Sequence, residues 1–347
     1  MHLDGSRHAV ELHLHVDGSF RPSTMFQIAK HRGLLLPAKS SEEFSNFLKI
    51  HERGNLPELL SKFDCITPIV AGDEEAISQC MTDFLEDCVK KSHLCYVEAR
   101  LAPHLLVGGG CSVEQVVKTV LEAMLSAATR FNIESRLILT MLRHQPQYAS
   151  EVISLAKAFQ PHGVCAIDLA GDDTPCDGTN TDLAVKEAFR EAYLSGVHRT
   201  VHAGVDGPSA SVREAIYDMF AERIGHGYHV IDDPALYMDV LEKNIHFEMC
   251  PLSGWLSGSV PESWRSHPII QFFGDQGNVS INTDDPTLTG QWRQQEIAMC
   301  LTDLGLTSTQ IERANINAAQ AAFLADVEKE ELLGHIAKAL GFRTIRD

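Results

Sequence analysis

The fold is decided by the stretch Glu11-Leu12-His13-Leu14-His15-Val16-Asp17-Gly18, in which an apolar strand pattern carries two histidines. Side chains of a strand alternate between its two faces, so His13 and His15 point one way while Leu12 and Leu14 point the other. The pattern fits a barrel strand that packs its apolar face against helices and turns the histidines into the barrel mouth. We therefore expect a functional site at the end of this strand.

Strand-like segments recur along the chain, and amphipathic stretches separate most of them. Apolar residues at helical spacing mark Ser112–Phe131, Asp182–Ser195 and Ser209–Phe220. Eight alternating strand and helix units favour a closed (β/α)8 TIM barrel over an open sheet. The predicted strands are Ala9–Leu14, Leu94–Arg100, Arg136–Leu142, Gly163–Leu169, Arg199–His202, Glu222–Gly225, Ile245–Met249 and Asn278–Asn282.

The interval between the first two strands is exceptional. Residues 19–93 hold several helical segments, among them Asn55–Val70 and Asp73–Lys91. An insertion after the first strand lies on the C-terminal face of a barrel, so we expect a helical lid over the site. The residues after Thr307 are expected to form closing helices, and residues 1–347 are predicted to form a single barrel domain.

The composition is that of a globular protein with an acidic surface. Among 347 residues, 47 Asp and Glu oppose 29 Lys and Arg, which gives a net charge of −18. Such a surface repels nucleic-acid phosphates and anionic lipids, so we expect neither nucleic acid nor a membrane as partner. The N-terminus lacks the apolar region of a signal peptide, and the nine cysteines form no C-x-x-C pair. These features predict a cytoplasmic protein with reduced thiols.

Polar residues also stand at the ends of three later strands. The fifth strand ends at His202-Ala203-Gly204, the sixth at Gly225-His226-Gly227 and the eighth at Asn282-Thr283-Asp284-Asp285-Pro286. The carboxyl ends of barrel strands converge on one face. Three imidazoles and a carboxylate suit zinc with an open position for water. We therefore predict one zinc ion per chain, bound by His13, His15, His202 and Asp284.

The histidine of the sixth strand is left beside the metal without being a ligand. Because zinc lowers the pKa of its bound water towards ~7, His226 can orient that water and accept its proton. Each motif alone is weak, since most H-x-H pairs are structural and Asp284-Asp285-Pro286 is typical of a turn or helix cap. Four such groups at four predicted strand ends are far more specific. Histidines elsewhere, such as His104 and His144, are expected to have no metal role.

These motifs resemble the adenosine deaminase family from about residue 9 to the closing helices. The resemblance implies a zinc-dependent TIM barrel that deaminates adenosine and 2′-deoxyadenosine to inosine and ammonia. Its partner would be a small-molecule purine nucleoside. Besides the stretches already quoted, the similarity lies in Tyr96-Val97-Glu98-Ala99-Arg100, Asp168-Leu169-Ala170-Gly171-Asp172, Glu222-Arg223-Ile224-Gly225-His226-Gly227-Tyr228-His229, Phe247-Glu248-Met249-Cys250-Pro251 and Asn315-Ile316-Asn317-Ala318-Ala319.

The resemblance also assigns roles to individual residues. It implies the zinc ligands named above, and it makes His226 and Asp284 catalytic residues. Asp17 would meet the ribose hydroxyls, and the backbone N–H of Gly171 would meet a purine ring nitrogen. Asp285 would accept from another ring nitrogen, while His15 would lie against the substrate as well as the metal.

One position departs from the family pattern His-Ala-Gly-Glu, because Val205 follows Gly204. The family glutamate protonates the purine ring nitrogen beside C6, whereas valine has no proton to donate. Three interpretations stay open: a natural member with weak or altered activity, an altered copy of an active enzyme, or a rearranged loop in which Asp206 substitutes.

Two other functions remain compatible with these residues. One is a zinc-containing nucleoside-binding protein with little turnover, which assays of inosine, ammonia and adenosine binding would identify. The other is an aminohydrolase of a different substrate, whose leaving group needs no ring protonation. A deaminase of polynucleotide bases is rejected, because that class uses H-x-E with P-C-x-x-C and this chain has no C-x-x-C.

Overall fold

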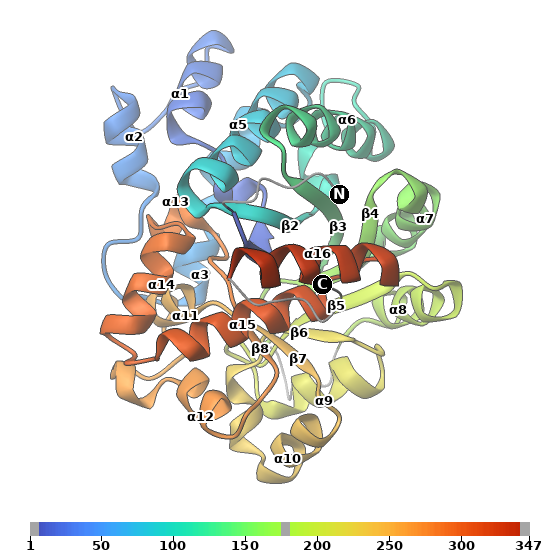
Figure 1. Cartoon of the computed structure of the whole chain (residues 1–347). Coiled ribbons are helices and arrows are strands. Elements are labelled where there is room, and N and C mark those ends of the chain that lie inside the picture. The colour runs from blue at the N-terminus through green and yellow to red at the C-terminus, as the bar shows by residue number, and fades with distance from the viewer. Residues whose placement is uncertain (1–6, 175–180, 341–347) are drawn as a thin grey trace.

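Parallel strands form the centre of the computed structural model, which describes residues 7–174 and 181–340 (Figure 1). Sequence order and sheet order are the same, from the first strand to the eighth. The predicted (β/α)8 TIM barrel is confirmed, and each predicted strand is present with its bounds shifted by at most two residues. The strands are β1 (Ala9–His15), β2 (Leu94–Leu101), β3 (Glu134–Leu142), β4 (Val164–Ala170), β5 (His198–Ala203), β6 (Arg223–His226), β7 (His246–Met249) and β8 (Val279–Ile281).

Backbone hydrogen bonds between β1 and the segment after β8 close the barrel. The N–H of His15 donates to the carbonyl of Asp284 at 2.9 Å, and the N–H of Asp284 donates to the carbonyl of His13 at 3.2 Å. The side-chain carbonyl of Asn282 also accepts the N–H of Leu12 at 3.0 Å. The two ends of the sheet are therefore joined at the residues of the predicted metal site.

Helices surround the strands and follow most of them in sequence. The predicted helices at 112–131 and 182–195 are present, whereas the one predicted at Ser209–Phe220 ends at Tyr217. Ser112 begins α6 by accepting the N–H of Gln115 at 3.2 Å. These helices are α6 (Val113–Phe131), α7 (Ala149–Phe159), α8 (Leu183–Ser195), α9 (Ser209–Tyr217), α10 (Pro234–Glu242), α11 (Pro251–Leu256), α12 (Pro268–Gly274), α13 (Pro286–Thr289) and α14 (Arg293–Thr302).

The long interval between β1 and β2 contains helices, as expected. The single stretch predicted at Asn55–Val70 is two helices, broken where the Ser61 hydroxyl donates to the carbonyl of Glu58 at 2.7 Å. In Figure 1 the first two of these helices, drawn in blue, stand to one side of the strands. The set comprises α1 (Pro22–His31), α2 (Ser41–Leu48), α3 (Leu56–Leu60), α4 (Phe63–Val70) and α5 (Glu74–Ser92).

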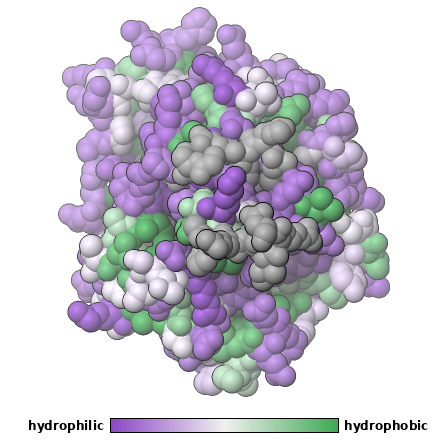
Figure 2. Space-filling model, in the orientation of Figure 1, coloured by the Kyte–Doolittle hydropathy of each residue, from purple (hydrophilic) through white to green (hydrophobic). Residues whose placement is uncertain are grey.

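Two closing helices, α15 (Ser308–Ala321) and α16 (Asp326–Ala339), follow Thr307 as predicted. Figure 1 shows them in red, crossing in front of the strands. The loop between them is tied to the barrel, because the backbone N–H of Phe323 donates to Glu98 at 2.5 Å. Figure 2 shows that hydrophilic residues cover most of this face, with apolar residues scattered among them.

Charged side chains fill part of the barrel interior. Glu248 accepts from Arg100 at 2.6 Å and from Arg223 at 2.7 Å, and Arg223 also pairs with Glu98 at 2.7 Å. All four side chains are almost fully buried. Buried charges are tolerated when they are paired in this way, so the network forms a rigid polar floor beneath the barrel mouth.

The hydrophobic core fills the space between the strands and the helices. Its largest cluster includes Leu14 and Val97 from strands and Phe84 and Val120 from helices. Every cysteine within the described residues is free. Among the helices of residues 7–174 and 181–340, none combines the length and the apolar character needed to cross a membrane.

Candidate active site

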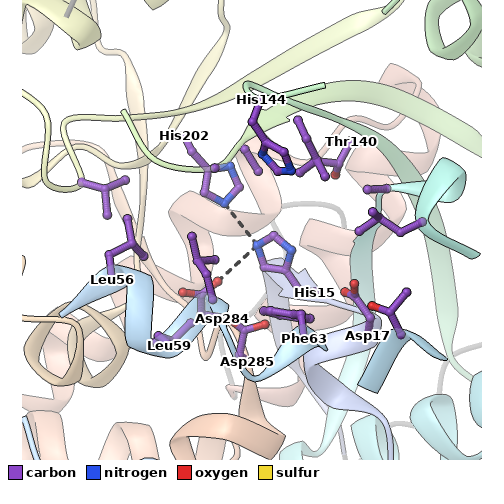
Figure 3. Close-up of a pocket in the computed structure, with 18 of the residues that line it drawn as sticks. His15, Asp17, Leu56, Leu59, Phe63, Thr140, His144, His202, Asp284 and Asp285 are labelled. Atoms are coloured by element: carbon purple, nitrogen blue, oxygen red, sulfur yellow. Dashed lines mark hydrogen bonds and ion pairs between the residues drawn. The ribbon is translucent and has the colours of Figure 1, made fainter. Parts of the chain in front are cut away.

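Histidines and an aspartate meet at the mouth of the barrel (Figure 3). The first strand carries His13 and His15, the fifth carries His202, and Asp284 follows the eighth. His15 Nε2 lies 3.1 Å from His202 Nε2 and 3.3 Å from Asp284 Oδ1. His13 Nε2 lies 3.2 Å from the same oxygen. The structure thus brings together the four residues that the sequence predicted as metal ligands.

The spacing of these atoms fits a single small divalent ion. Ligand atoms at 2.0–2.2 Å from a zinc ion lie roughly 3.0–3.6 Å from one another when the angle between them at the ion is about 90–115°. The observed separations of 3.1–3.3 Å lie within this range. In addition, His13 Nε2 and Asp284 Oδ1 are buried without a hydrogen-bond partner in the described part of the chain. Buried polar atoms normally have a partner, and a metal ion would supply one here.

His226 stands beside this group and faces the other oxygen of the aspartate. Its Nε2 lies 3.8 Å from Asp284 Oδ2, a longer separation than those among the four predicted ligands. Ligand atoms of His13, His202, His226 and Asp284 also lie within 4.8 Å of one another, so proximity alone would permit His226 to bind a metal. The shorter contacts of His15 favour His15 as the ligand and His226 as its neighbour.

Local backbone geometry makes this convergence possible. His226 and Asp284 have φ values of 62° and 63°, in the left-handed region that residues other than glycine rarely occupy. Such strain is typical of functional sites. A Cβ atom at Gly225 would lie 2.9 Å from His13 Cε1, so only glycine allows β6 to approach the histidine of β1 this closely.

Buried carboxylates orient two of the imidazoles. His13 Nδ1 lies 2.7 Å from Glu248, and His202 Nδ1 lies 3.0 Å from Asp168. Contacts of this kind fix the tautomer of a histidine and direct its other nitrogen towards a metal. Asp168 and Glu248 lie in two of the stretches that resemble the family, but neither could be assigned a role from the sequence, because each lies inside an apolar strand.

Burial sets the protonation of the site. Loss of solvation lowers the pKa of His202, and it lowers the pKa values of His15 and His226 well below the usual value, against the opposing effect of nearby carboxylates. For Asp284, burial acts to raise the pKa, but the surrounding imidazoles hold it well below the usual value. For His13, burial and the charge of Arg100 act to lower the pKa, but hydrogen bonds to Asp284 and Glu248 raise it above the usual value. His15, His202 and His226 are therefore neutral and Asp284 is ionised, which are the forms that bind a metal or accept a proton.

A cavity of about 430 Å³ opens onto this group. Its size lies within the roughly 300–1,000 Å³ range of small-molecule sites. Asp17, Gly171 and Asp285 line it, as expected for residues that meet the substrate. Two further contributions to the lining could not be predicted from the sequence: His144, from the loop after β3, and an apolar group of side chains from the inserted helices. That group consists of Leu56, Leu59, Leu60 and Phe63.

Two of the lining carboxyls hold their protons more firmly than usual. Burial raises the pKa of Asp17 to about 6. Burial, together with the nearby carboxylates of Asp284 and Asp17, raises the pKa of Asp285 well above its usual value. A protonated Asp285 can donate a hydrogen bond to a ring nitrogen, in contrast to the accepting role implied by the resemblance.

Val205 forms part of the cavity wall and is 6% exposed. The next residue, Asp206, is absent from the lining, and its carboxylate contacts the side chain of Ser259 instead. The interpretation in which Asp206 substitutes for the family glutamate requires Asp206 to face the substrate. The position of Asp206 outside the cavity lining is evidence against that interpretation.

A single carboxylate holds the loop that carries the valine. Asp173 accepts the backbone N–H groups of Gly204 at 2.7 Å, Val205 at 3.2 Å, Asp206 at 3.2 Å and Gly207 at 2.8 Å. All four consecutive amides are therefore engaged by Asp173, which does not line the cavity. The sequence offered no signal for this contact, because it depends on how the loops after β4 and β5 meet.

Asp173→Ala should lower the free energy of unfolding by about 3 kcal/mol, because several buried N–H groups lose their acceptor together. Asp173→Asn should cost less, since its amide oxygen can still accept. Urea unfolding of both variants would measure the effect. A loss below about 0.5 kcal/mol for the alanine variant would show that the loop does not depend on this carboxylate.

Known proteins resemble the chain along almost its whole length. The family model described as adenosine deaminase matches residues 9–339. Adenosine deaminase from Xenopus tropicalis is 41% identical over 345 residues, covering 96% of this chain and 95% of that protein. The Danio rerio adenosine deaminase is 40% identical over 346 residues, covering 96% of each. The solved adenine deaminase from Arthrobacter aurescens has a TM-score of 0.86 at 22% identity, covering 96% of this chain and 99% of that chain.

Proposed function

Because the chain belongs to the adenosine deaminase family, we propose that it hydrolyses adenosine and 2′-deoxyadenosine to the corresponding inosines and ammonia. One observation carries this function: the group of imidazoles and Asp284 opens directly into a cavity of about 430 Å³ lined by Asp17, Gly171 and Asp285. A reacting carbon held in that cavity would lie beside the metal-binding group, as hydrolysis requires.

We assign His13, His15, His202 and Asp284 as ligands of one zinc ion per chain. Imidazole and carboxylate donors suit zinc, and the separations of 3.1–3.3 Å support this set. When bound, zinc supplies a Lewis acid that lowers the pKa of a coordinated water towards ~7. Glu248 and Asp168 would keep His13 and His202 in the tautomers that face the ion.

His226 is the proposed general base, and its hydrogen bonds leave the correct nitrogen free. The hydroxyl of Tyr228 donates its only proton to the carbonyl of Cys250 at 2.7 Å. Its oxygen therefore accepts from His226 Nδ1, 3.2 Å away. The lone pair of the neutral ring then lies on Nε2, the nitrogen nearer Asp284. In this form His226 can accept the proton of the attacking water.

We place the nucleoside by the polar residues of the cavity. Asp17 would bind the ribose hydroxyls, Gly171 would donate its N–H to one ring nitrogen, and Asp285 would hydrogen bond to another. Water then adds to the purine carbon that bears the amino group, that carbon–nitrogen bond breaks, and ammonia leaves. The cavity lining supports this placement, because these three residues share it with His226.

A time course with purified, zinc-loaded protein tests the function. Adenosine should be converted to inosine with release of one ammonia per molecule. Val205 favours a second candidate, a nucleoside-binding protein with little turnover, because valine cannot protonate the ring. Tight adenosine binding without any inosine would establish that candidate in place of the first.

His202→Ala should lose most of the bound zinc, because it removes one of only three imidazoles from the proposed ligand set. Metal analysis of the purified variant measures this. His144→Ala is the matched control, since it removes a cavity histidine outside the ligand set and should leave the zinc content unchanged. Full occupancy in the His202 variant would refute the assignment of ligands.

We also propose a cytoplasmic location and a small-molecule purine nucleoside as the partner. The free cysteines of the described residues support a reducing compartment. The net charge of −18 disfavours binding to nucleic acid.

A further inference from the structure

We propose that the preferred substrate is a purine nucleoside already alkylated on the ring nitrogen beside the amino-bearing carbon, such as 1-methyladenosine. The inference rests on the proposed function, because it uses the same cavity, metal group and base. One feature of the cavity carries it, the apolar side chain of Val205 in the cavity wall, and the acidic character of the protein is compatible with it.

Hydrolysis at this carbon requires charge to be neutralised on the neighbouring nitrogen. As water adds to the carbon, an electron pair moves onto the ring nitrogen. In adenosine, that nitrogen must receive a proton from a positioned acid as the pair arrives. In 1-methyladenosine, the methylated ring carries a positive charge near neutral pH. The incoming pair then neutralises this charge, and no acid is required.

The part of the cavity surface formed by Val205 provides neither an acid nor a hydrogen-bond donor. In the proposed placement, Gly171 and Asp285 hold the other ring nitrogens, so the nitrogen beside the reacting carbon faces Val205. The backbone N–H groups of residues 204–207 are all bound to Asp173, and the carboxylate of Asp206 contacts Ser259. An unalkylated ring nitrogen would lose a hydrogen bond to water when it packs against Val205. A methyl group on that nitrogen would instead gain apolar contact with Val205.

The charge of the residues outside the proposed metal group is compatible with a cationic substrate. Asp17 and Asp64 carry carboxyl groups in the lining outside the ligand set, whereas zinc would offset the charge of Asp284. Within the described part of the chain, no lysine or arginine lines the cavity. The net charge of −18 adds a long-range attraction for cations. The nucleoside that needs no acid is thus also the one that the net charge of the protein attracts.

The reaction balances without a further reactant. The oxygen of water bonds to the ring carbon, the bond from that carbon to the amino nitrogen breaks, and the methyl group stays on the ring. One 1-methyladenosine cation and one water give neutral 1-methylinosine and one ammonium ion. The proton taken up by His226 leaves with the amine.

The test compares adenosine with 1-methyladenosine on the zinc-loaded full chain. Products are separated by chromatography with mass detection, and binding is measured by calorimetry. We expect kcat/KM to be at least about 10²-fold higher for 1-methyladenosine, because only adenosine suffers from the missing acid. Binding of 1-methyladenosine should also be tighter, by about 10-fold.

Variants at one position sharpen the comparison. Val205→Glu should reverse the preference, since its carboxyl can protonate adenosine but collides with the methyl group. Val205→Ala is the matched control, because residue 205 stays apolar. This variant should keep the preference for 1-methyladenosine.

The outcomes separate the inference from the proposed function. Conversion of adenosine alone, or weaker binding of 1-methyladenosine than of adenosine, would overturn the inference and leave the proposed function standing. Conversion of neither nucleoside by zinc-loaded protein would overturn the proposed function itself.

Discussion

Val205→Glu should raise kcat/KM for adenosine by at least about 10²-fold. In the proposed placement, a glutamate at this position would reach the ring nitrogen beside the reacting carbon and protonate it as water adds. A positioned acid typically contributes about 10²–10⁴-fold, which corresponds to roughly 3–5 kcal/mol of activation free energy. The side chain of residue 205 already lines the cavity, so no movement of the loop is required. Steady-state kinetics of the purified, zinc-loaded variant measure the gain.

Two kinds of control accompany the Val205→Glu variant. Zinc content and the affinity for a non-reacting nucleoside should change far less than kcat/KM, because neither depends on proton donation. Asp206→Asn should leave the slow adenosine activity of the parent chain unchanged, since Asp206 lies outside the lining. Full deaminase activity in the parent chain, abolished by Asp206→Asn, would mean that the loop rearranges and that Asp206 is the acid.

His226→Ala should lower kcat/KM by 10²–10⁴-fold or more while zinc stays bound. The alanine removes the proposed base, but it removes none of the four proposed ligands. The loss is best measured in the Val205→Glu background, where the adenosine reaction is fast enough to follow over several decades. Zinc is measured on the same preparations. Loss of zinc together with activity would show that His226 is a ligand.

Tyr228→Phe is the matched control for this variant. It keeps the imidazole but removes the oxygen that accepts from Nδ1, 3.2 Å away. The free ring can then adopt either tautomer, so we expect a smaller loss of kcat/KM than for His226→Ala. Zinc should be retained in both variants.

The sequence was sufficient to predict the barrel, since its signals are local. Apolar runs such as Leu94–Leu101 and Val164–Ala170 were recognisable in the sequence to within one residue of their bounds. Helix ends were less predictable, because they depend on single contacts. One predicted helix is divided in two where i→i+3 backbone hydrogen bonds, such as that from the N–H of Lys62 to the carbonyl of Leu59, replace the α-helical pattern, and the periodicity of apolar residues does not reveal this change.

The residues at strand ends were predictable for a topological reason. In a parallel barrel, the position of a residue along its strand fixes the face it reaches, so His13, His202 and Asp284 could be placed together without coordinates. Contacts between loops follow no such rule. Asp173 binds a loop that begins at Gly204, and His144 reaches the cavity from the loop after β3. These positions depend on three-dimensional packing that a single sequence does not reveal.

The bonds that join β1 to the segment after β8 have a consequence for biosynthesis. His13 and His15 leave the ribosome early, whereas Asp284 leaves it only after every barrel strand has been made. A nascent chain therefore carries these imidazoles long before the whole site exists. The proposed zinc ion would have no complete set of ligands until the last strand meets the first. Because a metal that binds only the folded state stabilises it, loading with zinc would lock the closed barrel at the moment of its completion.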